Sequence, residues 1–127
     1  MSKFKSQGLF NSFKNAGRGV RLSVRAERNI KIHITVATLV ILTALFLKMG
    51  VNKICILIIA ISNVMVAEFI NTSLEFGLDA VFKNRYSRLV GMAKDISAGA
   101  VVVATAFSVI IGLLLFGNEI LKLIAKV

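Results

Sequence analysis

The sequence predicts an all-α integral membrane protein in which an N-terminal amphipathic surface helix precedes three transmembrane helices. Hydrophobic residues make up 57% of the 127 residues and proline is absent, a composition typical of membrane proteins. The apolar residues also gather into three segments near or above the roughly 20 residues that a helix needs to cross a bilayer. We expect a single membrane domain over residues 1–127. Because three spans make only a thin bundle, we also expect the chain to form a homo-oligomer.

The segment from about residue 9 to 28 is expected to be the surface helix. Apolar side chains recur there at spacings of three and four residues, and so do basic side chains, which places two neighbouring stripes on one helix. The apolar stripe would enter the acyl boundary while the basic stripe reaches lipid phosphates. A solvated basic helix ahead of a membrane anchor is the alternative. The apolar stripe consists of Phe10, Phe13, Gly17, Val20 and Val24, and the basic stripe of Lys14, Arg18, Arg21, Arg25 and Arg28.

Three transmembrane helices are expected over residues of about 30–48, 54–82 and 94–117. The connection KMGVNK, residues 48–53, is short, so the first two spans should form a tight antiparallel hairpin. The third span carries four small residues at strict spacings of four, a pattern that lets another helix approach closely. These small residues are Ala100, Ala104, Ser108 and Gly112.

The basic residues predict how the chain is oriented in the membrane. Eight Lys or Arg precede the first span and four lie between the second and third spans, whereas four lie on the other side. By the positive-inside rule, the N-terminus and the second connection are cytoplasmic and the C-terminus is outside. The net charge of +10 is therefore explained by a membrane, and nucleic acid is not expected as a partner. We expect a multi-pass protein of the cell membrane.

The second span contains an unusual run of polar residues, in the stretch EFINTSLEFGLD that begins at Glu68. On a helix, Glu75 and Asp79 lie within about 20° of Glu68. Asn71 and Thr72 lie within about 60° of it, so all five share one face. A carboxylate inside a membrane is costly and usually functional. If the span begins at residue 54, the helical rise places Glu68 about 21 Å from the outer edge, just beneath the inner surface, and Glu75 at that surface.

Three interpretations of these acids remain open from the residues alone. They hydrogen-bond between helices, or Glu68 couples proton movement to transport, or the acids hold divalent cations at the membrane surface. The third is favoured, because Mg²⁺ takes oxygen ligands, often one or two carboxylates, and completes its shell with water and nucleotide phosphates. Glu27, Lys94 and Asp95 are expected at the same level, with Asp95 at the N-terminus of the third helix, where a negative charge is favourable. The lone His33 is expected to be an interfacial side chain.

Three segments of the chain form a specific pattern when they are taken together. They are ERNIKIH at residues 27–33, EFINTSLEFGLD at 68–79 and AKDISAGAV at 93–101. The pattern resembles the prokaryotic diacylglycerol kinase family of small membrane lipid kinases, over residues of about 10–117. The resemblance implies a homotrimer with active sites between protomers at the cytoplasmic membrane surface. It also implies that the γ-phosphate of ATP is transferred to a lipid alcohol, with Mg²⁺ accompanying the ATP.

The resemblance also implies roles for single residues. Glu68 would be the general base that accepts the proton of the lipid hydroxyl, and Glu27 and Glu75 would be Mg²⁺ ligands. Asp79 belongs to the motif in a supporting role. Many relatives carry an Arg in the surface helix at the position where this chain has Gly8. The residues that the resemblance places around ATP are Asn71, Lys94, Asp95, Arg85, Tyr86 and Ser87.

The lipid alcohol differs within that family, since some members phosphorylate diacylglycerol and others phosphorylate undecaprenol. The stretch NAGRGVRLSVRAERNIKIH, residues 15–33, resembles the undecaprenol kinases of Gram-positive type. We therefore expect undecaprenol, which would give undecaprenyl phosphate for recycling of a cell-wall carrier lipid. Phosphorylation of diacylglycerol to phosphatidic acid is the alternative. A non-enzymatic or proton-coupled transport subunit is the alternative from another class.

Overall fold

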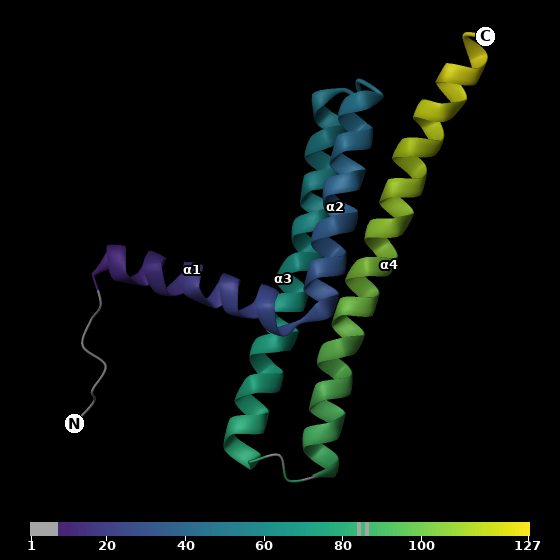
Figure 1. The fold of residues 1–127 in the computed structure, drawn as a ribbon. Helices are drawn as coiled ribbons and strands as arrows, with labels where there is room; N and C mark the ends of the chain where they lie inside the picture. Colours follow the sequence, from purple (N-terminus) through teal and green to yellow (C-terminus); the bar gives the residue numbers. More distant parts are fainter. Residues whose placement is uncertain (1–7, 84, 86) are drawn as a thin grey trace.

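The computed structural model describes residues 8–83, 85 and 87–127, and every regular element in this part of the chain is a helix. The helices are α1 (Leu9–Ala26), α2 (Arg28–Phe46), α3 (Val51–Phe82) and α4 (Arg88–Ala125). In Figure 1, α2 and α3 form an antiparallel hairpin, α4 runs alongside them, and α1 extends away from the bundle across its long direction. The all-α fold class predicted from the sequence is confirmed.

The helices α2, α3 and α4 are long and apolar enough to cross a membrane. They contain 19, 32 and 38 residues. At a rise of about 1.5 Å per residue, α3 and α4 are about 48 and 57 Å long. Both exceed the roughly 30 Å of a hydrocarbon core, so each continues beyond it.

The long α4 changes the place of Asp95. The helix begins at Arg88, directly after the N-cap residue Ser87, and not near residue 94; no proline interrupts the turns that follow. Asp95 therefore lies about two turns inside the helix, and the first turn contains no acidic residue. The prediction that Asp95 stands at the N-terminus of this helix is wrong.

The helices bury only a small part of their apolar surface against one another. α4 packs mainly against α3, and Ala44, Met49 and Leu57 form a small core at the α2–α3 turn. Large side chains along α4 stay open, with Phe107 63% and Leu113 69% exposed. Apolar surface of this extent is typical of chains that meet lipid or another protein chain.

The small residues of α4 are used in part within the chain. Ala104 is 8% exposed, and the Ser108 hydroxyl donates a hydrogen bond to the Ala60 carbonyl oxygen of α3 at 2.9 Å. Ala100 remains exposed. Small side chains at this seam let the two helix backbones approach closely.

A tight turn closes the α2–α3 hairpin. Lys48 adopts a left-handed backbone conformation with φ 52°. The Met49 amide N–H donates to the Ala44 carbonyl oxygen at 3.0 Å, a bond typical of helices that end in this conformation. Gly50 is then the N-cap residue of α3. The turn thereby determines which α2 residues lie opposite which α3 residues.

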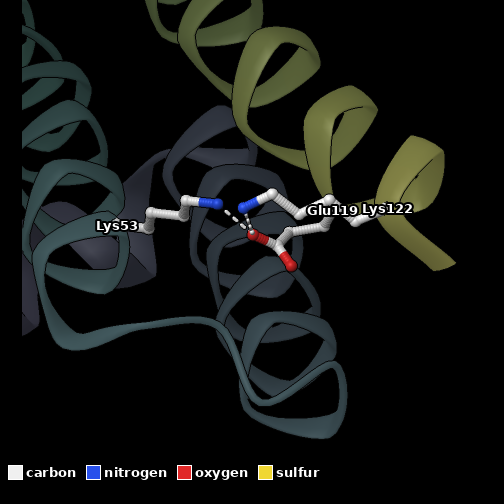
Figure 2. A network of polar contacts seen from close by, with 3 residues as sticks. All are labelled: Lys53, Glu119 and Lys122. Carbon is white, nitrogen blue, oxygen red and sulfur yellow. Dashed lines mark hydrogen bonds and ion pairs between the residues drawn. The ribbon is translucent and has the colours of Figure 1, made fainter. Parts of the chain in front are cut away.

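An ion-pair cluster joins α3 to α4 near this turn, at the end of the bundle opposite to the α3–α4 connection (Figure 1). Figure 2 shows that Lys53 of α3 points toward Glu119 of α4 and forms an ion pair with it. Lys122 Nζ lies 3.8 Å from the same Glu119 oxygen. The cluster holds the N-terminal end of α3 against α4.

Candidate functional site

The polar residues of α3 begin on the face that packs against its neighbours. The buried residues of this helix recur at spacings of three and four, so they form one stripe along it. The stripe is apolar in its N-terminal part and polar in its C-terminal part. Its members are Leu57, Ala60, Val64, Glu68 and Thr72. The predicted base therefore continues the core and does not face lipid.

Glu68 is 3% exposed and is paired with a residue of the neighbouring helix. Its Oε1 lies 3.1 Å from Nε2 of His33 on α2. A buried carboxylate needs a hydrogen-bond donor to offset the loss of water, and the His33 imidazole lies close enough to supply one when Nε2 carries its proton. Sequence reasoning had assigned His33 only an interfacial place, so it missed this contact.

Two cavities meet at His33. A cavity of about 560 Å³ is lined by Glu68 and His33 together with the polar residues Asn29, Asn71 and Thr105. A second cavity of about 310 Å³ extends from His33 between α2, α3 and α4, and its walls are mostly apolar. His33 and Thr105 each line both cavities, the polar one beside the carboxylate and the apolar one between the three helices.

One turn further along α3, Asn71 and Glu75 interact with each other. The Asn71 amide donates to Glu75 Oε1 at 3.2 Å. Within the described residues, Asn71 Oδ1 is then buried without a hydrogen-bond partner, and so is the hydroxyl of Thr72. Buried polar atoms in native proteins are nearly always satisfied. These two oxygens therefore mark a place where a ligand, an ion or another chain can bond.

A second polar site lies where α3 ends and α4 begins. Lys94 Nζ donates to Asp79 Oδ1 at 2.6 Å. A cavity of about 250 Å³ beside this pair is also lined by Arg85 and Ser87. The structure thus brings together three of the residues predicted to surround ATP and the supporting Asp79.

The two polar sites lie at different heights on α3. Glu75 follows Glu68 by seven residues and Asp79 follows it by eleven. These separations correspond to about 10 and 16 Å of helical rise. The Asn71–Glu75 contact lies between the buried Glu68 and the Asp79–Lys94 pair. The three α3 acids therefore lie at successive heights along one helix.

Other predicted site residues stand apart from these contacts. Glu27 is half-buried in the extended break between α1 and α2, with φ −110° and ψ 121°. Asp95 is exposed on α4, and Tyr86 lies outside the described residues. Over residues 8–83, 85 and 87–127, no three Asp, Glu, His or Cys side chains gather where they could hold a metal ion. Mg²⁺ ligation by Glu27 and Glu75 therefore stays a prediction.

Comparison of the sequence with known proteins shows which family the chain matches. Residues 14–116 match the family described as prokaryotic diacylglycerol kinase. The undecaprenol kinase of Bacillus subtilis (strain 168) is 35% identical over 108 residues, which cover 85% of this chain and 87% of that protein. The diacylglycerol kinase of a Synechocystis species is 35% identical over 104 residues, which cover 82% of this chain and 59% of that protein. The matched residues include His33, Glu68, Asp79 and Lys94.

Proposed function

The chain belongs to the prokaryotic diacylglycerol kinase family and is a lipid kinase, and we propose that it transfers the γ-phosphate of ATP to undecaprenol. The observation that carries the proposed chemistry is the environment of Glu68. This carboxylate is buried, has a donor at 3.1 Å and lines an open cavity. A base in such a place can accept a proton from an alcohol without exposure of the reaction to bulk water.

The depth of Glu68 agrees with a lipid hydroxyl as the acceptor. If α3 enters the hydrocarbon at Val51, Glu68 lies about 25 Å along the helix, inside a core about 30 Å thick. Asp79 then lies beyond the membrane edge, where a water-soluble nucleotide arrives. This layout supports an active site at one membrane surface, and the distribution of basic residues supports the cytoplasmic one.

In the proposed reaction, residues at different heights along α3 have different roles. As the lipid oxygen bonds to the γ-phosphorus, Glu68 accepts the hydroxyl proton, and the bond from that phosphorus to the β-phosphate oxygen breaks to release ADP. Lys94 and Arg85 would hold the phosphates, while Ser87, Asn71, Asp95 and Tyr86 would complete the nucleotide site. Phosphoryl transfer depends mainly on such positioning and charge neutralisation.

The oxygen donors along the site fit a magnesium ion that accompanies ATP. Glu27 and Glu75 would supply carboxylates, and the unpaired Asn71 Oδ1 supplies a neutral oxygen beside Glu75. Mg²⁺ prefers oxygen ligands and often takes only one or two carboxylates, the rest being phosphate and water. When bound, it would neutralise phosphate charge.

We also propose that the working form is a homotrimer. The large exposed apolar side chains of α4 support association. The unsatisfied oxygens of Asn71 and Thr72 support the same idea, because a neighbouring chain can supply donors to them. The helix α1 would lie in the membrane surface, with its apolar side chains in lipid, since Phe10 and Phe13 are 81% and 72% exposed.

Diacylglycerol is the second candidate substrate, because the Synechocystis diacylglycerol kinase is as similar to this chain as the Bacillus undecaprenol kinase is. The greater coverage of the Bacillus protein favours undecaprenol. Membership of a kinase family argues against the non-enzymatic or proton-coupled transport alternative.

A direct assay distinguishes the substrates. The purified full-length chain in lipid bicelles is given labelled ATP, Mg²⁺ and either undecaprenol or diacylglycerol at equal mole fraction. We expect label in undecaprenyl phosphate with a kcat/KM at least about tenfold above that for diacylglycerol. The reverse ratio would assign diacylglycerol, and transfer to neither alcohol would contradict the proposal.

A further inference from the structure

We propose that His33 is a positioning residue that holds the Glu68 carboxylate in place for proton transfer. The inference rests on the proposed function, because it gives Glu68 the role of base. It begins from one contact between two helices, the 3.1 Å separation of His33 Nε2 and Glu68 Oε1. Neither the cation site nor the nucleotide site requires His33.

The Glu68 carboxylate depends on this contact. Among the described residues, His33 is the partner that the structure gives it, and the Glu68 side chain is 4% exposed. A buried carboxylate that loses its donor keeps the full cost of leaving water. With Oε1 beside the imidazole, Oε2 is the oxygen left to receive a proton.

The backbone around His33 is held firmly enough to act as a support. Ile30, one turn before His33 on α2, is 0% exposed. Further along the hairpin, Ala44 packs against Leu57. A side chain whose helix is fixed on both sides can orient its partner, whereas a side chain on a loose segment cannot.

The position of the His33 imidazole also explains why an apolar residue there could not replace it as the partner of Glu68. His33 lines both the polar cavity beside Glu68 and the aliphatic cavity between the helices. An aliphatic side chain would still close the apolar cavity, but it would leave the carboxylate without a donor. Glutamine would keep a side-chain N–H at nearly the position of Nε2.

Two substitutions of His33 distinguish the loss of its hydrogen-bond donor from a change in the space that the side chain fills. His33→Leu removes the donor, and His33→Gln retains one. With the alcohol that the wild type prefers, we expect His33→Leu to lower kcat about ten- to a hundred-fold, the loss typical of a hydrogen bond to a buried charge. The KM for ATP should stay within about twofold, because ATP binds at the Lys94 level, and His33→Gln should recover most of the kcat. The matched control is Thr38→Val, which removes an exposed hydroxyl from the same helix and should leave both constants unchanged.

A thermal double-mutant cycle tests the contact without catalysis. The fall in Tm caused by His33→Leu should be clearly smaller in a Glu68→Gln background, because residues in contact are not additive. Additive shifts would overturn the inference, and so would an unchanged kcat in His33→Leu or equal losses in His33→Leu and His33→Gln. A wild type that transfers phosphate to neither alcohol would overturn the proposed function itself, and with it the role of Glu68. An active wild type that tolerates His33→Leu would overturn only the role of His33.

Discussion

Replacing Glu68 by Gln should abolish most of the phosphoryl transfer while the fold survives. The substitution keeps the shape of the side chain, and the amide oxygen of Gln can still accept from His33 Nε2. The hydrogen bond changes from a charge-assisted one to a neutral one, a loss of about 1 kcal/mol. Part of that loss is offset because a neutral amide is easier to bury than a carboxylate at 3% exposure.

The catalytic effect should be several times larger than the structural one. A positioned general base contributes about 10²- to 10⁴-fold to a rate, equivalent to about 2.7 to 5.4 kcal/mol of activation free energy. We therefore expect kcat to fall by at least about a hundredfold with Tm nearly unchanged. The KM for ATP should change little, because Glu68 lies about 16 Å of helical rise from Asp79.

The assay measures initial rates with labelled ATP and the preferred alcohol, alongside thermal unfolding of the same preparation. The matched control is Glu119→Gln, which makes the same carboxylate-to-amide change at the opposite end of the bundle and should leave kcat intact. Wild-type kcat in Glu68→Gln would refute the assignment of the base. A hundredfold loss accompanied by a collapse of Tm would instead show that Glu68 serves the fold.

Other predictions follow from the remaining contacts. Lys94→Met should raise the KM for ATP about ten- to a hundred-fold, since a charge-assisted contact to phosphate is lost, whereas equal losses in Lys94→Met and Asp79→Asn would indicate that only their mutual ion pair matters. Glu75→Ala should raise the Mg²⁺ concentration for half-maximal activity by at least about tenfold, because mutation even of residues outside a metal's ligand shell lowers the affinity of the site for the metal by that much. An unchanged Mg²⁺ titration would exclude Glu75 as a ligand. Lys53→Met should lower Tm with little dependence on salt, since the pair with Glu119 is half-buried and such pairs are screened less than exposed ones, and any large loss of kcat would contradict a structural role for the pair.

The existence of the helices followed from the sequence, and so did the start of α1 and the end of α3, but the two ends of α4 did not. Apolar length is a local property, so three spans could be predicted from runs of about 20 residues. The C-terminal part of α4 is held in addition by a contact between residues distant in the sequence. The helix continues past Gly117 to Ala125, and Glu119 in this extension pairs with Lys53 of α3. The pairing of Glu119 with Lys53 cannot be predicted from the local sequence, although the residues that follow Gly117 are mostly good helix formers.

The His33–Glu68 contact follows from the predicted hairpin once a single contact between its two helices is known. The connection between the spans is short, and the turn brings Ala44 into one core with Leu57. His33 lies eleven residues before Ala44, and Glu68 lies eleven residues after Leu57. Eleven residues are close to three whole turns of a helix, so both side chains return to the face that the first pair occupies. What sequence reasoning lacked was one contact to set the register.

The partners of the α3 acids also bear on where a cation would bind. Glu68 is paired with His33 of α2, and Asp79 is paired with Lys94 of α4. Glu75, between them, has among the described residues only the neutral amide of Asn71. A half-buried carboxylate without a basic partner gains most from a bound cation, because no other positive charge offsets its loss of water. Of the three α3 acids, Glu75 is therefore the one whose carboxylate would gain most from the Mg²⁺ that we propose to accompany ATP.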